Sequence, residues 1–433
     1  MRRFLILVAL AVTATLPAVI LRLGGWQPSP FVDVAAFGIA ILAAGFLLSW
    51  GAETAEQHIS QGLILAAVAL VTVLPEYAID IYYAYMAGAS GPNSQYVQYA
   101  AANMTGANRL LVGLAWPLMV LLHWMKDRHR SIDLAPGNAV EVGFLLLASL
   151  YAFVIVLKRS ISLLDFVVLI AIFGAYVWRA RNLQKSDNPE EAEEPGPAAA
   201  LNTLSPGLQW TAMVGLVAVA GGVILVSAEP FAEAMVSTGR LIGLNEFLLI
   251  QWLAPLASEA PAITVAVLFV RANRAGDGLI AMISDKINQW TLLVGMLPLA
   301  LSIGAGAISP LPLDARQGEE FFLTAAQSLL GIALLLRLRL GLWSALALAA
   351  LFTVQVGLAF VYRNDEARTI ATLTWLAWAY LGLAGLLFLI DGRRLFTLLR
   401  GAVMGDFSKL EPPGSEGDSD VQRSEREASS IAG

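Results

Sequence analysis

The chain has 433 residues, of which 58% are hydrophobic and 14% are charged, with a formal net charge of −6. Soluble globular chains are about a quarter charged, so this composition excludes an ordinary soluble domain. The sequence has no cysteine, which excludes disulfides and thiolate metal sites. It also carries no basic patch of the kind that binds nucleic acid.

Apolar runs of about 20 residues recur along the whole chain and are long enough to cross a bilayer as helices. They are continuous rather than alternating, which argues against a transmembrane β-barrel. We therefore predict an all-α polytopic membrane protein with about 12 transmembrane helices. These expected spans are 4–22, 31–52, 62–88, 96–124, 140–158, 163–180, 208–235, 245–270, 277–304, 319–338, 341–362 and 369–390.

Polar segments divide the chain. The stretch "LQKSDNPEEAEEPGPAAALNTLSPG" is acidic and proline-rich, which is typical of a flexible linker, and the acidic tail is typical of disorder. The first span follows "MRR" and is interpreted as a retained anchor; a cleaved signal peptide is the alternative. The predicted units are an N-terminal helix, a first repeat, a linker, a second repeat, a C-terminal helix and a tail, at 1–30, 31–182, 183–207, 208–363, 364–404 and 405–433.

The distribution of basic residues predicts the orientation. With the N-terminus in the cytoplasm, fifteen Lys and Arg residues near span ends lie inside and seven lie outside. We therefore expect an integral protein of the cell membrane with both termini cytoplasmic. Its partners would be the lipid bilayer and inorganic cations, with no nucleic acid and no cofactor. The sequence does not indicate an oligomeric state.

Two stretches share ordered features. The first contains "GAETAEQ", "VTVLPEYAID" and "ANMTGANRLLVGLAWPL"; the second contains "SAEPFAEA", "LAPLASEAPA" and "MISDKINQWTLLVGMLPL". In each, a glutamate lies beside proline in an apolar helix and a polar helix ending in "LLVG" follows. Five spans separate the starts of the two units, so they have opposite orientations. Inverted repeats build alternating-access transporters with the substrate site near the bilayer midplane.

These two stretches resemble the α-repeats of the sodium/calcium exchanger, or cation/calcium antiporter, superfamily. The matching segments are "VTVLPE" and "ANMTGAN" in the first repeat, and "APLASE" and "MISDKINQW" in the second. The resemblance covers about residues 31–180 and 208–362. It implies two inverted five-helix repeats with one extra helix at each end, and a secondary active cation antiporter. Several motif residues differ, including the Gly and Ser of the first motif.

The resemblance implies that Glu76, Asn103, Glu259 and Asp285 coordinate the transported cation. The spacing agrees, because Asn103 follows Glu76 by 27 residues and Asp285 follows Glu259 by 26. Carboxylate and amide oxygens are the hard ligands that calcium prefers, and intramembrane acids are costly unless they are functional. We expect calcium as the cargo. Pro75 is expected to free a backbone carbonyl near Val71 as a further ligand.

Other polar residues lie in the same helices. Thr72, Asp80, Asn108 and Asn288 are further candidates for the site, and Gln289 and Gln251 are expected either behind the ligands or in helix–helix hydrogen bonds. Arg109 and Lys286 either pair with a carboxylate or act as built-in cations in the acidic cage. Glu229 and Glu233 are expected at the outer interface, in contact with water.

We therefore predict that the protein exports calcium in exchange for protons or sodium, and protons are favoured. The alternative is a degenerate exchanger-fold protein with a regulatory or channel-like role. No enzymatic activity is expected, because the only segment similar to an intramembrane aspartyl protease motif, "AGDGL", falls in a loop. The two functions differ in whether Glu76, Asn103, Glu259 and Asp285 converge on one small cavity.

Overall fold

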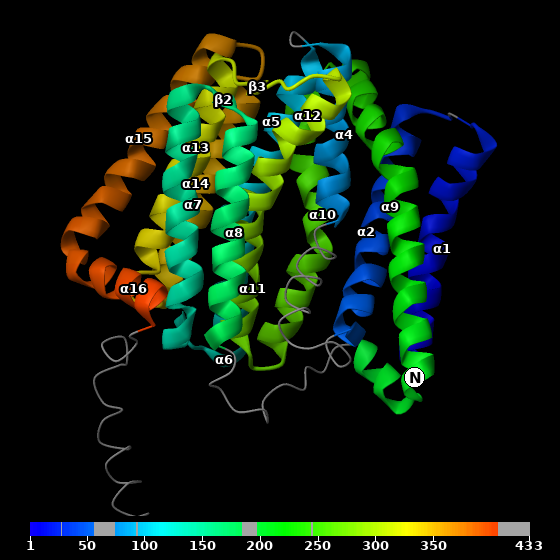
Figure 1. Cartoon of the computed structure of the whole chain (residues 1–433), viewed down its shortest axis with the longest axis horizontal. Helices are drawn as coiled ribbons and strands as arrows, with labels where there is room; N and C mark the ends of the chain where they lie inside the picture. Colours follow the sequence, from blue (N-terminus) through cyan, green and yellow to red (C-terminus); the bar gives the residue numbers. More distant parts are fainter. Residues whose placement is uncertain (27, 56–73, 92–93, 184–196, 244–245, 406–433) are drawn as a thin grey trace, which may run out of the picture.

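The computed structural model describes residues 1–26, 28–55, 74–91, 94–183, 197–243 and 246–405. Within these ranges the chain is a bundle of long helices (Figure 1). The α-helices are α1 (Arg2–Gly24), α2 (Pro30–Ala55), α4 (Leu74–Ser90), α5 (Gln95–Leu110), α6 (Trp116–Asp127), α7 (Ala139–Lys158), α8 (Leu163–Leu183), α9 (Pro206–Ile242), α10 (Glu246–Arg271), α11 (Ala275–Asn288), α12 (Val294–Ala305), α13 (Ala315–Leu334), α14 (Leu342–Val361), α15 (Glu366–Ile390) and α16 (Gly392–Met404).

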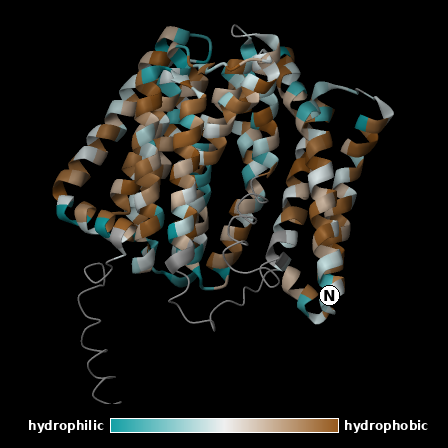
Figure 2. Ribbon diagram, viewed as in Figure 1, coloured by the Kyte–Doolittle hydropathy of each residue, from teal (hydrophilic) through white to brown (hydrophobic). Residues whose placement is uncertain are grey.

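Ten helical segments of the described chain are long and apolar enough to cross a membrane. Helices α4 and α13 correspond to the two remaining expected spans, so the predicted architecture of about twelve spans is confirmed. Figure 2 shows mainly hydrophobic ribbon on the peripheral helices α1 and α15. Many apolar side chains on these helices are exposed because, in a bilayer, they face lipid rather than water.

The structure differs from the expected boundaries in two places. The predicted linker 183–207 contains a short 3₁₀-helix, η4 (Pro197–Thr203), in which Ala198 and Leu201 are buried. These two apolar side chains pack against the ends of α1 and α2, so this part of the linker is structured. The segment between α15 and the tail forms the additional helix α16, which we did not predict separately.

Two short strand pairs join the halves of the chain. Strand β1 (Ser131–Asp133) pairs with β4 (Arg339–Gly341), and β2 (Ser160–Ile161) pairs with β3 (Leu311–Pro312), both antiparallel. Strands β1 and β3 follow the third helix of their repeat, and β2 and β4 follow the fourth. Each pair therefore joins the loop after the third helix of one repeat to the loop after the fourth helix of the other. These two loops lie at the same end of the bundle because the repeats are inverted.

A second symmetric feature lies inside the helices. Chain segments α5–α6 and α11–α12 are each interrupted by one π-helical turn, η1 (Leu111–Ala115) and η5 (Gln289–Leu293). Each π turn overlaps the "LLVG" sequence of its repeat. π-Bulges occur frequently at functional sites. The two interrupted helices cross the middle of the bundle and carry most of the polar candidates.

Helices α1, α2 and α9 form a group at one side of the bundle (Figure 1). Helices α4 and α10 pack between this group and the rest. We call the end of the bundle that carries β2 and β3 the outer end, and the end that carries the N-terminus and α16 the inner end. These names follow the distribution of basic residues.

Candidate cation site

Glu76 and Glu259 lie on equivalent helices of the two repeats. Glu76 is in the first described turn of α4, directly after Pro75, and Glu259 lies in α10 between Pro255 and Pro261. Their exposed fractions are 1% and 3%. A carboxylate buried this deeply is costly unless a partner neutralises or solvates it.

Gln289, the first residue of the π turn η5, joins the two glutamates. Its side-chain Nε2 donates to Glu76 Oε2 at 3.2 Å and to Glu259 Oε1 at 2.6 Å. The two acceptor oxygens can therefore be no more than about 6 Å apart, the sum of the two hydrogen-bond lengths. The two repeats thus bring one carboxyl group each to a single point.

Asp80 and Asn103 form a second part of the site. Asp80 lies one helical turn after Glu76 on α4, and Asn103 Nδ2 on α5 donates to Asp80 Oδ1 at 2.9 Å. Both side chains are completely buried. Asp80 is close enough to Glu76 and Glu259 for their charges to repel. The candidate Asp80, for which the second repeat has no acidic counterpart, therefore belongs to this acidic group.

Several oxygens in this region have no hydrogen-bond donor. They are buried, and none accepts a hydrogen bond from a described residue: Glu76 Oε1, Asp80 Oδ2, Asn103 Oδ1 and Gln289 Oε1. Buried polar atoms are almost always satisfied, so a group of free acceptors favours a positively charged or proton-donating guest. Carboxylate and amide oxygens of this kind suit calcium.

Asp285 lies at the edge of the acidic group. It precedes Gln289 by one turn on α11, is partly exposed, and is close enough to Glu76 and Glu259 for charge repulsion. Within the described ranges, however, no three Asp, Glu or His side chains are close enough together to hold a metal ion. Amide oxygens, backbone carbonyls, water or a further approach of the helices would have to complete a calcium shell.

The prolines of α10 leave the helix continuous from Glu246 to Arg271. Pro255 has no N–H, so the carbonyl of Gln251 lacks its usual helical donor. Gly106 of α5 packs against this carbonyl: a Cβ atom at position 106 would lie 1.8 Å from Gln251 O. Glycine is required here because α5 and α10 approach so closely. The carbonyl near Val71 that we expected Pro75 to free lies outside the described residues.

The buried cations do not enter the acidic group. Arg109 forms an ion pair with Glu320 of α13, with 2.6 Å between Nη1 and Oε2, and stacks over the ring of Trp252. Lys286 Nζ donates to the backbone oxygen and side-chain Oδ1 of Asn108, at 2.9 and 3.2 Å. Of the two alternatives for these bases, Arg109 shows the pairing with a carboxylate, and Lys286 binds Asn108 instead.

One further candidate, Asn288, contacts a residue beside Glu76. Asn288 accepts a hydrogen bond from the Tyr77 hydroxyl at 2.9 Å, which joins α11 to α4 beside Glu76. Thr72 lies outside the described residues. The sequence predicted Gln289 only behind the ligands or in helix–helix hydrogen bonds, and it did not indicate Glu320 or Tyr77. The only sequence feature that pointed to Gln289 is its position next to the repeated motif.

Helix α13 contacts both bulged helices. Besides the Glu320–Arg109 pair, Gln327 Nε2 donates to the carbonyl of Arg109 at 3.4 Å, next to η1, and Ser328 accepts from the indole N–H of Trp290 in η5 at 2.9 Å. Side chains of one helix thus contact both π-bulged segments.

Known proteins with similar sequences and structures identify the family of this chain. A family model described as "Sodium/calcium exchanger protein" matches residues 29–180. The crystal structure of the H+/Ca2+ exchanger CAX is 37% identical to this chain and has a TM-score of 0.84, and the match covers 94% of this chain and 99% of that one. This chain belongs to the sodium/calcium exchanger superfamily.

Other members of the superfamily share the fold at lower identity. The Ca2+/H+ antiporter protein YfkE is 17% identical with a TM-score of 0.56, over 82% of this exchanger and 99% of YfkE. The sodium–calcium exchanger NCX_Mj is 21% identical with a TM-score of 0.51, over 76% of this exchanger and 98% of NCX_Mj. No protein with a curated description matches the chain.

Two sets of contacts join helices toward the outer end of the exchanger. Glu233 of α9 accepts hydrogen bonds from the hydroxyls of Tyr82 on α4 and Tyr96 on α5, so it is partly buried and tied to tyrosines rather than solvated as we expected. Gly88 and Gly304 allow α4 and α12 to touch, because Cβ atoms there would lie 2.0 and 2.1 Å from opposing backbone oxygens. Glu229 pairs with Arg22 of α1 and is exposed.

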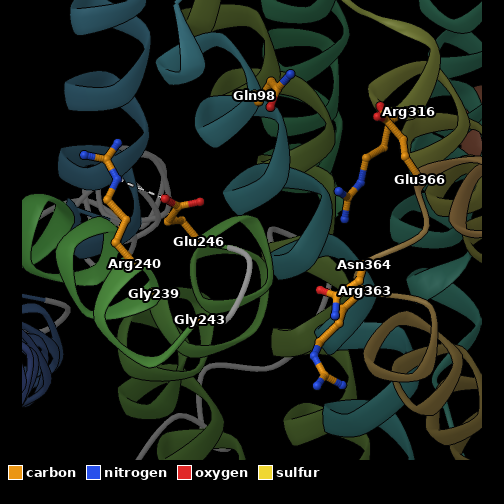
Figure 3. Close-up of a pocket in the computed structure, with 9 residues that line it drawn as sticks. All are labelled: Gln98, Gly239, Arg240, Gly243, Glu246, Arg316, Arg363, Asn364 and Glu366. Carbon is orange, nitrogen blue, oxygen red and sulfur yellow. Dashed lines mark hydrogen bonds and ion pairs between the residues drawn. The ribbon is translucent and has the colours of Figure 1, made fainter.

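A polar cavity of about 570 Å³ lies at the outer end, away from the two glutamates. Figure 3 shows Arg240 directed toward Glu246, the pair that forms one side of the cavity, with Arg316 and Arg363 on the other side. Its lining contains none of the predicted cation ligands: Gln98, Gly239, Arg240, Gly243, Glu246, Arg316, Arg363, Asn364 and Glu366. The exchanger therefore has a polar cavity at its outer end beside α5 and α10, distinct from the buried acidic group.

Proposed function

We propose that this exchanger is a secondary active antiporter that exports calcium in exchange for protons by alternating access. The observation that carries the proposal is the meeting of Glu76 and Glu259, one from each inverted repeat, on the amide of Gln289. Two carboxyl groups this close, with little water around them, are stabilised by a shared proton or by a bound cation. The same two groups can therefore hold either guest, as an antiporter requires.

Calcium is supported by the chemistry of the acceptors. The acidic group offers oxygen ligands only, from Glu76, Asp80, Asn103, Asp285 and Glu259, and calcium takes six to eight such ligands in flexible geometry. Arg109 and Lys286, the buried cations of the described residues, are held by Glu320 and Asn108. The relative with 37% identity is described as an H+/Ca2+ exchanger.

The residues around Glu259 favour protons over sodium as the counter-ion. Pro255 and Leu256 supply no side-chain oxygen, and the hydroxyl of Ser258 donates to backbone carbonyls within its own helix. Sodium would thus find few hydroxyl ligands in this repeat, whereas a proton needs only a carboxylate.

The proposed movement is of α2 and α9 against the remaining helices, which exposes the acidic group to one end at a time. The hydrogen bonds from Tyr82 and Tyr96 to Glu233 join α9 to α4 and α5 at the outer end. They would have to break when the site opens outward. The exchanger would lie in the cell membrane with both termini cytoplasmic, as the distribution of basic residues predicts, and no covalent chemistry is required.

The test is calcium flux into or out of proteoliposomes that contain the purified chain. Calcium movement should follow an imposed pH gradient without sodium, and should respond weakly to a sodium gradient at fixed pH. Liposomes without protein are the control. Strong drive by sodium with no response to pH would overturn the proton coupling while leaving the calcium site intact.

The alternative is a degenerate exchanger-fold protein with a regulatory or channel-like role. This alternative is favoured because no three carboxylates among the described side chains are close enough together to hold a metal ion. It predicts no coupled flux: either no calcium movement at all, or movement that only dissipates the calcium gradient. Uphill calcium accumulation driven by a pH gradient would exclude it.

A further inference from the structure

Helix α16 leaves α15 at an angle and runs across the inner end of the bundle toward α7 (Figure 1). Its sequence, GRRLFTLLRGAVM, has apolar residues at helical spacing and three arginines. A helix in this position and of this composition is not needed to span the membrane, because α15 already does so.

One apolar face of α16 is covered by the bundle. Leu398 and Ala402 have exposed fractions of 0% and 2%, and Ala402 packs so closely on α7 that a Cβ atom at Gly143 would lie 2.5 Å from its Cβ. Arg179 of α8 donates to the carbonyl of Ala402 at 3.2 Å. These contacts hold α16 firmly against the protein.

A second apolar face is not covered by described residues. Phe396 and Val403 are 71% and 72% exposed, and the half-buried Leu399 lies between them on the same side of the helix. This face is adjacent to the last turn of α15, where Leu389 and Ile390 are 84% and 65% exposed. The apolar surface that α15 presents to lipid thus continues onto α16.

The charge of α16 is positive on its exposed polar side. Arg393, Arg394 and Arg400 are exposed, and the helix contains no acidic residue. The acid nearest to its start, Asp391, accepts hydrogen bonds from Arg337 at 3.0 and 2.9 Å, and this arginine holds the pKa of Asp391 below its usual value. Asp391 also lies 3.9 Å from Nε of Arg394, so this one carboxylate faces Arg337 and Arg394 together and cannot neutralise both charges. With three arginines and no acid of its own, α16 keeps a net positive charge.

We propose that α16 is a membrane-surface helix that binds the anionic headgroups of phospholipids. Phe396, Leu399 and Val403 enter the acyl boundary, and the arginines on the neighbouring polar side contact phosphate groups, which is how basic amphipathic helices bind anionic bilayers. The docking on α7 positions the helix at this depth. The inference does not depend on which ions the exchanger carries.

The absence of cysteine from the sequence makes a direct test simple. A spin label is attached to Phe396→Cys, and to Val403→Cys as a second variant, in the full-length protein in vesicles of phosphatidylcholine with or without phosphatidylglycerol. Its exposure to oxygen dissolved in lipid is compared with its exposure to a nickel complex in water. Trp375→Cys, on the lipid-facing middle of α15, is the control for a label that stays in lipid.

Labels at both α16 positions should be several-fold more accessible to oxygen than to nickel, and more so with phosphatidylglycerol. Combining either label with Arg393→Gln, Arg394→Gln and Arg400→Gln should remove the dependence on phosphatidylglycerol. A label exposed to water in both kinds of vesicle would overturn the proposal. Equal burial in both lipids, unaffected by the glutamines, would overturn the anionic headgroup contact and leave an apolar anchor only.

Discussion

Gln289 donates its amide to one carboxyl group from each repeat, and this shared donor determines how the site responds to single substitutions. The two glutamates differ in their other surroundings. Glu76 has a free acceptor oxygen and lies near Asp80, whereas Glu259 makes the shorter bond to Gln289. Neither glutamate pairs with Arg109 or Lys286, so substitution should leave no cation without its partner.

Glu76→Gln and Glu259→Gln should each abolish calcium flux with little loss of stability. Each change keeps the shape of the side chain and removes one charge from the acidic group. Flux is measured in proteoliposomes, and the thermal unfolding midpoint in detergent reports folding. Glu246→Gln, in an exposed ion pair at the outer end, is the matched control and should retain flux. Wild-type flux from either mutant would show that the glutamates are structural.

The sequence predicted much of this site at the residue scale. The proline–glutamate pairs located Glu76 and Glu259, and the structure brings them together. Asn103 and Asp285, predicted from the same spacing, lie near these glutamates: Asn103 donates to Asp80, and Asp285 is partly exposed on α11. Gln289 was expected only behind the ligands or in helix–helix hydrogen bonds, because the π turn η5 that begins at this residue decides which side chain faces the centre, and a π turn leaves no clear mark in the sequence. Glu320 lies on α13, and its pairing with Arg109 depends on the packing of helices far apart in the sequence.

At the scale of elements, side chains of α13 contact both π-bulged segments through Arg109 and Trp290. The Arg109–Glu320 ion pair is almost completely buried, with side-chain exposures of 1% and 3%. Removing one partner of a buried ion pair leaves the charge of the other partner buried and uncompensated. Surface pairs contribute much less because water solvates both partners.

Glu320→Gln should therefore destabilise the protein by about 3–5 kcal/mol, because Arg109 would keep its charge without a partner. The comparison is Glu246→Gln, which breaks the exposed pair with Arg240 and should cost about 0–1 kcal/mol. Thermal or denaturant unfolding in detergent measures both. Replacing Arg109 and Glu320 together by Met and Leu should recover stability, and equal stability of the two single mutants would contradict the role of the pair.

Element positions followed from the sequence wherever apolar runs were long. Helix α13 was recognised as a span despite its polar stripe, because 319–338 is still mainly apolar. Helix α16 was not separated from the preceding span, since only a single turn around Asp391 divides them. The strands β1 to β4 are two or three residues long and depend on pairing with a distant loop, so no local pattern predicted them.

At the scale of the whole molecule, the strand pairs determine what holds the two halves together. Both β1·β4 and β2·β3 join a loop of one repeat to a loop of the other, one pair at each end of the bundle. Helices α2 and α9, from different repeats, also pack along their length. The covalent connection between the repeats, by contrast, is one polar segment at the inner end.

The exchanger should therefore tolerate being made as two separate polypeptides. A break between residues 184 and 196 leaves six predicted spans in each piece, with every strand pair and the α2–α9 contact intact between them. The two fragments, co-expressed with a tag on only one, should purify as a stable pair and still move calcium in proteoliposomes. Recovery of the tagged half alone would mean that the peptide link, rather than the crossed strands and packed helices, unites the halves.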